Sequence, residues 1–169
     1  MNLHSTLSPA QAVAARREAV VATARRLIGV PYLHQERDPR VGLDCGGLVI
    51  VSLLRNGWVP RFEDSLRQDY RPPDDAWMEE TVAREWRQVE VVEVAPADVL
   101  LFAWPFRAHA EHMALVSEHN GFGFQIVHTA PMYGRVVEHD LEREFDGTPH
   151  LYGMRFCGAW RVPMLEEVC

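Results

Sequence analysis

Hydrophobic positions change their spacing about halfway along the chain, and the first half has helical spacing. Over residues 9–28, which are rich in alanine and arginine, the apolar residues at 12, 15, 19, 22 and 27 have helical spacing, which predicts a helix. Ser8, Pro9 and Gln11 form the start signature of such a helix, with a polar cap, a proline at the first position and a glutamine three residues after the cap. Gly29 is expected to end it.

Two further helices are predicted before the spacing changes. Residues 45–55 read as a short buried helix that Asp44 caps, although residues 48–54 also fit a buried strand. A helix from Asp75 to about position 86 follows an irregular, proline-containing connection, residues 58–73. The sequence leaves open whether that connection is a lid or a surface loop.

From position 89 onward the apolar residues alternate or form short runs, which is typical of strands. A turn at residues 95–98 leads into a buried strand, and a hairpin is expected around Asn120 and Gly121. The predicted strands are 89–91, 99–104, 113–117, 124–129, 135–139 and 158–162. Helices first and an antiparallel sheet second indicate an α+β fold with the helices on one face of the sheet. We expect one domain over residues 1–169, with its core at about 9–163.

Composition narrows the class of protein. With 169 residues, 47% hydrophobic and 24% charged, the chain has the size and balance of one globular domain. Its longest apolar run, residues 99–104, is far too short to span a bilayer. A net charge of −7 argues against nucleic-acid binding. The N-terminus lacks the basic and apolar regions of a signal peptide, so synthesis in the cytoplasm without export by such a peptide is expected.

Cys45 is the candidate nucleophile among three cysteines, an odd number that disfavours a disulfide framework. It follows the capping Asp44, where the partial positive charge of a helix N-terminus favours a thiolate. Gly46 and the next glycine are costly in a first helical turn, which suggests close approach of a substrate or of the facing sheet. The alternative is that Cys45 is a small buried hydrophobic residue. Cys157 is expected to be buried and inert.

A nucleophilic thiol needs a base, and His112 and His128 are the candidates on neighbouring strands. A three-residue loop, 119–121, would place them directly opposite each other, whereas a two-residue turn would put His128 on the other face. The sequence does not decide between the two registers. We interpret His139, by contrast, as a solvated surface residue.

Metal chemistry is the rival use of the histidines. His109, His112 and His119 lie close together in sequence with two glutamates nearby, yet their spacing matches no zinc pattern. No metal and no cofactor are therefore expected.

Five short segments in order resemble the NlpC/P60 cysteine peptidases, papain-like enzymes that cut peptidoglycan stem peptides. The segments are 29–32, 44–48, 97–102, 112–116 and 126–131. The resemblance spans residues 18–162. It implies an acyl-enzyme mechanism with Cys45 as nucleophile, His112 as base and His128 as the residue that orients the imidazole. It further implies that Tyr32 assists the oxyanion hole and Asp44 meets the substrate amino group.

The chain also departs from that family. Gly46 stands where serine is usual, which affects a substrate contact or a backbone restraint, and Ala97 stands where glycine is usual. The segments around Tyr32 and residues 37–42 resemble phage-tail and gene-transfer-agent members more than secreted ones. Tail or tail-like particle proteins are therefore expected partners, beside the peptidoglycan substrate, and such a particle would carry the enzyme to the cell wall.

The resemblance implies hydrolysis of the bond between D-glutamate and a diamino acid. Two other functions remain open. One is a catalytically silent phage-tail or wall-binding module, and the other is a papain-like amidase or acyltransferase. The exact bond, the peptidoglycan type and the oligomeric state are not determined by the sequence.

Overall fold

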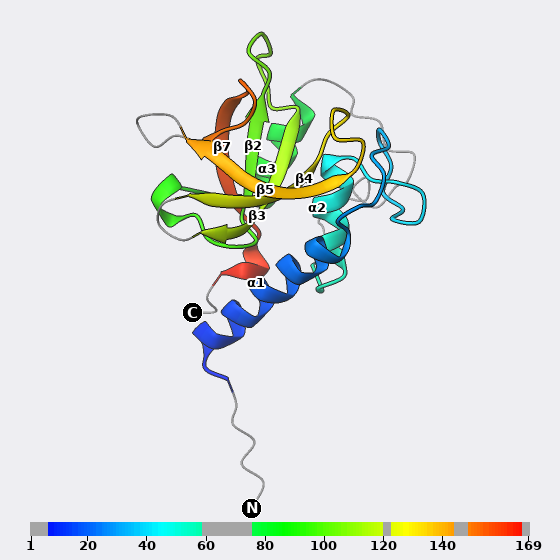
Figure 1. Ribbon diagram of the computed structural model, residues 1–169. Coiled ribbons are helices and arrows are strands. Elements are labelled where there is room, and N and C mark those ends of the chain that lie inside the picture. Colours follow the sequence, from blue (N-terminus) through cyan, green and yellow to red (C-terminus); the bar gives the residue numbers. More distant parts are fainter. Residues whose placement is uncertain (1–6, 59–75, 120–122, 144–148, 167–169) are drawn as a thin grey trace, which may run out of the picture.

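The computed structural model describes residues 7–58, 76–119, 123–143 and 149–166. Within these ranges the chain forms three α-helices and seven strands, with the helices on one face of the sheet as expected (Figure 1). The helices are α1 (Pro9–Arg26), α2 (Cys45–Leu54) and α3 (Trp77–Glu85), with short 3-10 turns at Val91–Glu93 and Pro163–Leu165. The strands are β1 (Arg87–Val89), β2 (Val99–Ala103), β3 (His112–His119), β4 (Phe124–Thr129), β5 (Val136–Arg143), β6 (Pro149–His150) and β7 (Arg155–Arg161).

Helix starts follow the predicted capping chemistry where a side chain is available to cap. Ser8 and Gln11 form the complete capping box of α1, and the Asp44 carboxylate caps α2. The N-cap position of α3 is Ala76, which offers no side-chain cap, whereas the predicted cap Asp75 lies outside the described residues. The proposed connection at 58–73 is also outside them, apart from Trp58.

The strands pair antiparallel throughout, in the order β1-β7-β2-β3-β4-β5-β6. The sequence prediction is wrong at two places. The first strand ends at Val89, because the chain turns into a 3-10 helix at Val91–Glu93. The short strand β6 carries too few residues to show an alternating pattern, so it was missed.

Two apolar cores lie on opposite faces of the sheet. Alternate residues of β2 belong to different cores, since Leu101 packs towards the helices and Leu100 packs on the other face. The helix-side core includes Val20, Leu48, Val49, Leu53, Val99, Met113, Leu115 and Val127, and the other includes Phe102, Ala114, Val116, Phe124, Ile126 and Leu141. Burial on both faces explains why β2 reads as a continuous apolar run.

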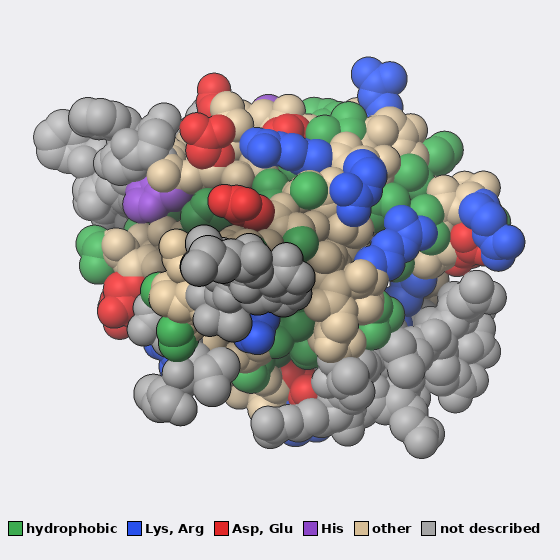
Figure 2. Space-filling model, turned by 90° about the horizontal axis from the view of Figure 1, so that it is seen from below, with side chains coloured by type: hydrophobic (Ala, Val, Ile, Leu, Met, Phe, Trp, Pro, Cys, Tyr) green, Lys and Arg blue, Asp and Glu red, His purple; other side chains and the backbone are tan. Residues whose placement is uncertain are grey.

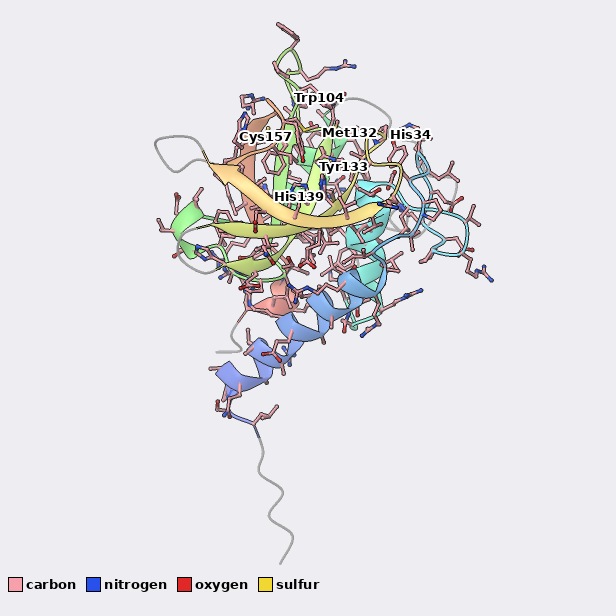
Figure 3. The ribbon with its side chains drawn as sticks, in the orientation of Figure 1. His34, Trp104, Met132, Tyr133, His139 and Cys157 are labelled. Atoms are coloured by element: carbon pink, nitrogen blue, oxygen red, sulfur yellow. The ribbon has the colours of Figure 1, made fainter. Side chains whose placement is uncertain are left out.

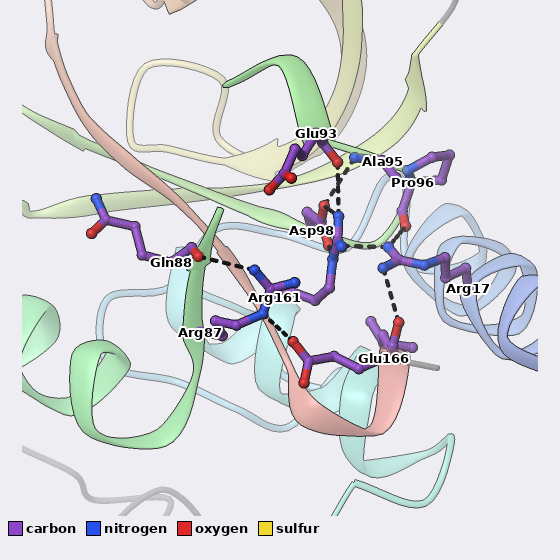
Figure 4. Close-up of polar contacts among 10 residues, drawn as sticks. Arg17, Arg87, Gln88, Glu93, Ala95, Pro96, Asp98, Arg161 and Glu166 are labelled. Atoms are coloured by element: carbon purple, nitrogen blue, oxygen red, sulfur yellow. Dashed lines mark hydrogen bonds and ion pairs between the residues drawn. The ribbon is translucent and has the colours of Figure 1, made fainter. Parts of the chain in front are cut away.

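The turn before β2 is held by a buried carboxylate. Asp98 is fully buried and accepts two bonds from Arg161 of β7, at 2.9 and 2.8 Å, and one from Arg17 of α1 at 3.0 Å (Figure 4). It also accepts from the Ala95 N–H at 2.9 Å. Ala97 has φ +70°, a conformation that suits the glycine usual in the resembling family, so this departure carries a local strain.

Both arginines also donate hydrogen bonds to backbone carbonyl oxygens. Arg17 donates to the carbonyl oxygens of Pro96 and Leu165, at 2.7 and 2.9 Å, and Arg161 donates to that of Glu93 at 2.8 Å. The carboxylate therefore joins the first helix, the turn into the central strand and the last strand. Removing one partner from a buried ion cluster of this kind is costly, because the remaining charges stay buried without compensation.

No helix among the described residues is long and apolar enough to cross a membrane. On the face seen in Figure 2, arginine and acidic side chains are interspersed.

We predict that Asp98→Asn lowers the free energy of unfolding by about 3–5 kcal/mol, because two buried guanidinium groups lose their counter-charge. Urea denaturation monitored by tryptophan fluorescence measures this. Glu166→Gln, which removes the surface ion pair with Arg87, is the matched control and should cost under about 1 kcal/mol. A loss for Asp98→Asn no larger than the control's would contradict the assigned role.

Candidate active site

Asp44 fixes the position of the candidate nucleophile. Its Oδ1 accepts from the Gly47 N–H at 2.6 Å and its Oδ2 accepts from the Gln35 N–H at 3.0 Å. One carboxylate thus caps α2 and anchors the preceding loop, which places Cys45 as the first helical residue. Burial raises the pKa of this carboxyl group.

The two glycines after Cys45 have different reasons to be small. A Cβ on Gly47 would stand 2.4 Å from the Glu36 carbonyl oxygen, so the loop passes too close for any side chain. A Cβ on Gly46 would meet nothing nearer than Asp44 Oδ1 at 3.5 Å, which is ordinary contact. The backbone that comes close to these glycines is therefore that of the loop before the helix, and not the substrate or the facing sheet that the sequence suggested. It comes close only at Gly47.

Cys45 lies against the backbone at the start of β3. The half-buried thiol is 4.0 Å from the carbonyl oxygen of Glu111 and also receives a backbone hydrogen bond from Met113. These two residues flank His112, so the sulfur lies beside the strand position that carries the predicted base.

The electrostatic expectation for this thiol is wrong in direction. Burial, followed by the nearby Asp44 carboxylate, raises the pKa of Cys45 to about 12, although backbone N–H groups at the helix start oppose the rise. Desolvation of the sulfur therefore outweighs the helix N-terminus. At neutral pH the resting residue is a thiol and not a thiolate.

His112 and His128 form a buried hydrogen bond. His112 Nε2 lies 2.9 Å from His128 Nδ1, and the rings cross at 79°. The side chains are 5% and 1% exposed, which removes both rings from solvent. Burial lowers the pKa of His112 to about 4 and that of His128 to about 2, the latter helped by the neighbouring imidazoles of His112 and His139.

Neither of the two registers that the sequence left open is found, yet the two rings share a face. Strand pairing continues to His119 opposite Phe124, so the connection is longer than the predicted loop 119–121. A bulge between Val116 and Glu118 then adds one residue to β3. Beyond it the ladder has Leu115 opposite Val127, which makes His112 and His128 diagonal neighbours on the same side.

His139 is the site residue that the sequence analysis missed. Its Nε2 lies 2.7 Å from His128 Nε2, and its Nδ1 lies 2.7 Å from the carbonyl oxygen of Asp140. The prediction of a solvated surface residue is therefore wrong. In the pairing of β4 with β5, His139 is opposite Ile126 and Val137 is opposite His128, so His139 and His128 are diagonal neighbours on the same side of the sheet. That register depends on the turn at 130–135, which carries no strong sequence signal for its length.

Tyr32 lies near the thiol. Burial raises the pKa of the Tyr32 hydroxyl, and the negative charges of the nearby Cys45 and Asp44 raise it further. The hydroxyl is also 3.4 Å from His34 Nδ1. The Tyr32 backbone is held by its N–H, which donates to the Gly134 carbonyl oxygen at 2.9 Å, and by a parallel bridge to Leu43.

The remaining candidates lie elsewhere. His109 pairs with Glu79 at 3.0 Å and His119 packs on the Phe124 ring, so the two do not join His112 in a shared ligand set. Among the described residues no group of three or more histidines, cysteines or carboxylates is arranged to hold a metal ion. Cys157 is half-buried with its sulfur 3.5 Å from the Arg155 carbonyl oxygen, and burial raises its pKa.

Comparison with solved structures shows that the chain has the NlpC/P60 fold. The NlpC/p60 domain of the peptidoglycan hydrolase SagA is 18% identical with a TM-score of 0.55, covering 86% of this chain and 98% of that one. An NlpC/P60 family protein from Bacillus cereus has 17% identity and a TM-score of 0.61, covering 86% of this chain and 40% of that one.

A lipoprotein-like NLP/P60 protein from Staphylococcus aureus has 18% identity and a TM-score of 0.58 over 96% of this chain. The chain spans under half the length of the B. cereus and S. aureus proteins. No known family profile matches the sequence, and no curated protein matches it either. The fold and its NlpC/P60 neighbours confirm the structural class that the motifs predicted.

We predict a loss of stability on mild acidification. The folded-state pKa values of His112 and His128 lie below the 6.5 of an unfolded chain. The contribution of these two histidines to the free energy of unfolding is therefore constant above pH 6.5. Below 6.5 only the unfolded state takes up these protons, until the folded pKa is reached. Each histidine then removes up to about 1.4 kcal/mol per pH unit.

Urea denaturation of the wild type and of His128→Gln at pH 7, 6 and 5 measures this slope. The free energy of unfolding of the variant should fall less steeply with decreasing pH, by up to about 1.4 kcal/mol per pH unit, because one of the two buried histidines is gone. Carboxylates titrate in both proteins, so their contribution cancels in the comparison. Parallel curves would show that His128 is not held neutral by the fold.

Proposed function

We propose that this chain is a cysteine peptidase that hydrolyses peptidoglycan stem peptides, with Cys45 as nucleophile, His112 as general base and His128 as the orienting residue. The observation that carries the proposal is the buried 2.9 Å contact between His112 and His128 beside a thiol at a helix start. Because Nε2 of His112 is engaged by His128, Nδ1 is the nitrogen left for the thiol. Nucleophile, base and orienting group are the three parts that such catalysis requires.

Proton transfer in this mechanism accompanies attack and does not precede it. The pKa of the thiol is raised and that of His112 is lowered, so both groups rest neutral at pH 7. As the sulfur attacks the amide carbon, its proton passes to His112 Nδ1. The same imidazolium then protonates the leaving amine, which leaves a thioester on Cys45. Water activated by His112 hydrolyses that thioester and restores the thiol.

Two donors are available for the negative charge on the tetrahedral intermediate. The backbone N–H of Cys45 is at the first turn of α2, where it has no partner within the helix. The Tyr32 hydroxyl lies near the sulfur. We assign these two groups to the oxyanion hole, where each such donor accounts for about 10²–10³ in rate.

The substrate class rests on the fold neighbours and on local charge. One neighbour is a named peptidoglycan hydrolase. We propose the bond between D-glutamate and the diamino acid as the scissile one, with the substrate amino group at Asp44. That carboxylate already accepts two backbone bonds but keeps free lone pairs for a third donor. Carriage on a phage-tail-like particle remains part of the proposal.

A catalytically silent wall-binding module is the second candidate function. The observation that favours it is the raised pKa of the Cys45 thiol, since most cysteine nucleophiles have a lowered one. A module of this kind would bind muropeptides and release no fragment. Binding and cleavage are measured in the same experiment below.

We predict that Cys45→Ala abolishes hydrolysis of soluble muropeptides while binding and thermal stability stay near wild type. Mass spectrometry of the products after incubation detects the cleaved bond and identifies it. Cys157→Ala is the matched control, because it removes the other free thiol of the described residues, whose sulfur lies 3.5 Å from the Arg155 carbonyl oxygen, and it should retain activity. Cleavage that persists in Cys45→Ala would refute the assignment, and binding without cleavage by the wild type would support the silent module.

We predict an unusually acidic lower limit for activity. The free enzyme loses its base when His112 is protonated, and burial lowers that pKa to about 4. The acid limb of kcat/KM against pH should therefore fall near pH 4 instead of near 6.5. Initial rates on a stem peptide between pH 3.5 and 9 measure it. An acid limb near 6.5 would mean that the base is solvated in the free enzyme.

A further inference from the structure

The row of imidazoles does not end at the third site residue. His128 is 1% exposed, and its second ring nitrogen, Nε2, lies 2.7 Å from Nε2 of His139. His139 in turn places Nδ1 2.7 Å from the Asp140 carbonyl oxygen. Three rings and one backbone carbonyl thus form a continuous line that starts at the proposed base.

The carbonyl at the end of this line sets the direction of every hydrogen bond in it. A carbonyl oxygen only accepts, so a His139 ring with a single N–H carries it on Nδ1 and accepts at Nε2. His128 then donates from Nε2 and accepts at Nδ1. His112 donates from Nε2 in consequence, and its Nδ1 keeps a free lone pair. That lone pair is what a general base needs to receive the thiol proton.

Aromatic rings hold the third imidazole in place. The His139 ring lies 5.8 Å from that of Tyr133 and 5.9 Å from that of Tyr152. Tyr133 also packs edge-on against His128 at 5.2 Å. His139 and Tyr133 are labelled in Figure 3, where they lie close to β5 and to the turn that precedes it. Packing on several sides limits rotation of the ring, so the nitrogen that faces His128 stays Nε2.

We propose that His139 is a positioning residue that, through the Asp140 carbonyl, locks His128 and His112 in the tautomer with Nδ1 of His112 unprotonated. The tautomer assignment depends on the structure alone, whereas its catalytic consequence rests on the proposed function. Without an acceptor at position 139, the buried Nε2–H of His128 would lose its partner. The alternative tautomer of His128, with its proton on Nδ1, would then compete. Its Nδ1–H would donate to Nε2 of His112, and the His112 proton would move to Nδ1, the nitrogen that has to be free.

Nitrogen-15 spectra of histidine-labelled protein at pH 7 test the tautomers directly, because protonated and unprotonated ring nitrogens resonate far apart. The wild type should show His112 and His128 protonated at Nε2 only. His139→Gln, whose side-chain oxygen accepts, should keep this pattern. His139→Leu should give mixed tautomers. His139→Lys, which only donates, should reverse the pattern and place the proton of both rings on Nδ1.

Hydrolysis rates on a soluble stem peptide provide the second readout. We expect kcat to fall about 10- to 100-fold in His139→Leu, to fall further in His139→Lys and to recover substantially in His139→Gln, with little change in KM. His119→Leu, which removes a histidine packed on Phe124 at the far end of β3, is the control and should match the wild type. Recovery by a side chain that can accept, but not by one that only donates, is a result that a merely structural role does not give.

The outcomes separate this inference from the proposed function. A wild type whose His128 is protonated at Nδ1 overturns the inference even if no variant at 139 folds. Unchanged tautomers in His139→Leu overturn it as well, whatever the activity. Hydrolysis that persists in Cys45→Ala overturns the proposed function and leaves the tautomer result standing.

Discussion

The buried carboxylate of Asp98 is the interaction on which the arrangement of this molecule most depends. It joins α1 through Arg17, the turn into β2 through the Ala95 N–H, and β7 through Arg161. The first helix and the last strand are far apart in sequence, so ordering them around one charge closes the fold. β2 is thereby fixed beside β3, the strand that carries His112. The site is therefore supported by an ion cluster that takes no part in its chemistry.

Burial governs the electrostatics of the site more than any single charge does. It raises the pKa of Cys45 and lowers that of His112, and both changes favour the neutral thiol and imidazole over a thiolate–imidazolium pair. The resting site is consequently neutral. A row of imidazoles that each carry a single N–H has a defined direction of hydrogen bonding, and this is why a backbone carbonyl at its far end can influence the proposed base.

Similarity to solved NlpC/P60 structures extends over most of the chain at 14–18% identity. At that distance the shared feature is the fold, and local departures need their own explanation. Gly46 leaves room for the serine that is usual there, so the departure is not forced by packing. Ala97 adopts a positive φ in the Asp98 turn and is kept there by hydrogen bonds on both sides of it.

The sequence by itself determined the parts of this protein that depend on neighbouring residues. The capping box at Ser8, the cap at Asp44 and the strand at 99–103 are local, because each follows from side chains within a few positions or from an unbroken apolar run. The place of Cys45 at a helix start was also predicted from residue type and order, whereas the register of His112 against His128 was left open.

Tertiary structure decided what depends on register and burial. The extra residue in β3 near Ser117 put His112 and His128 diagonally on one face, and no pattern of residue types marked that bulge. His139 entered the row only because β5 pairs with β4 in one particular register. The direction of the Cys45 pKa shift was misjudged for the same reason, since desolvation is a property of the packed molecule and not of the helix that carries the thiol.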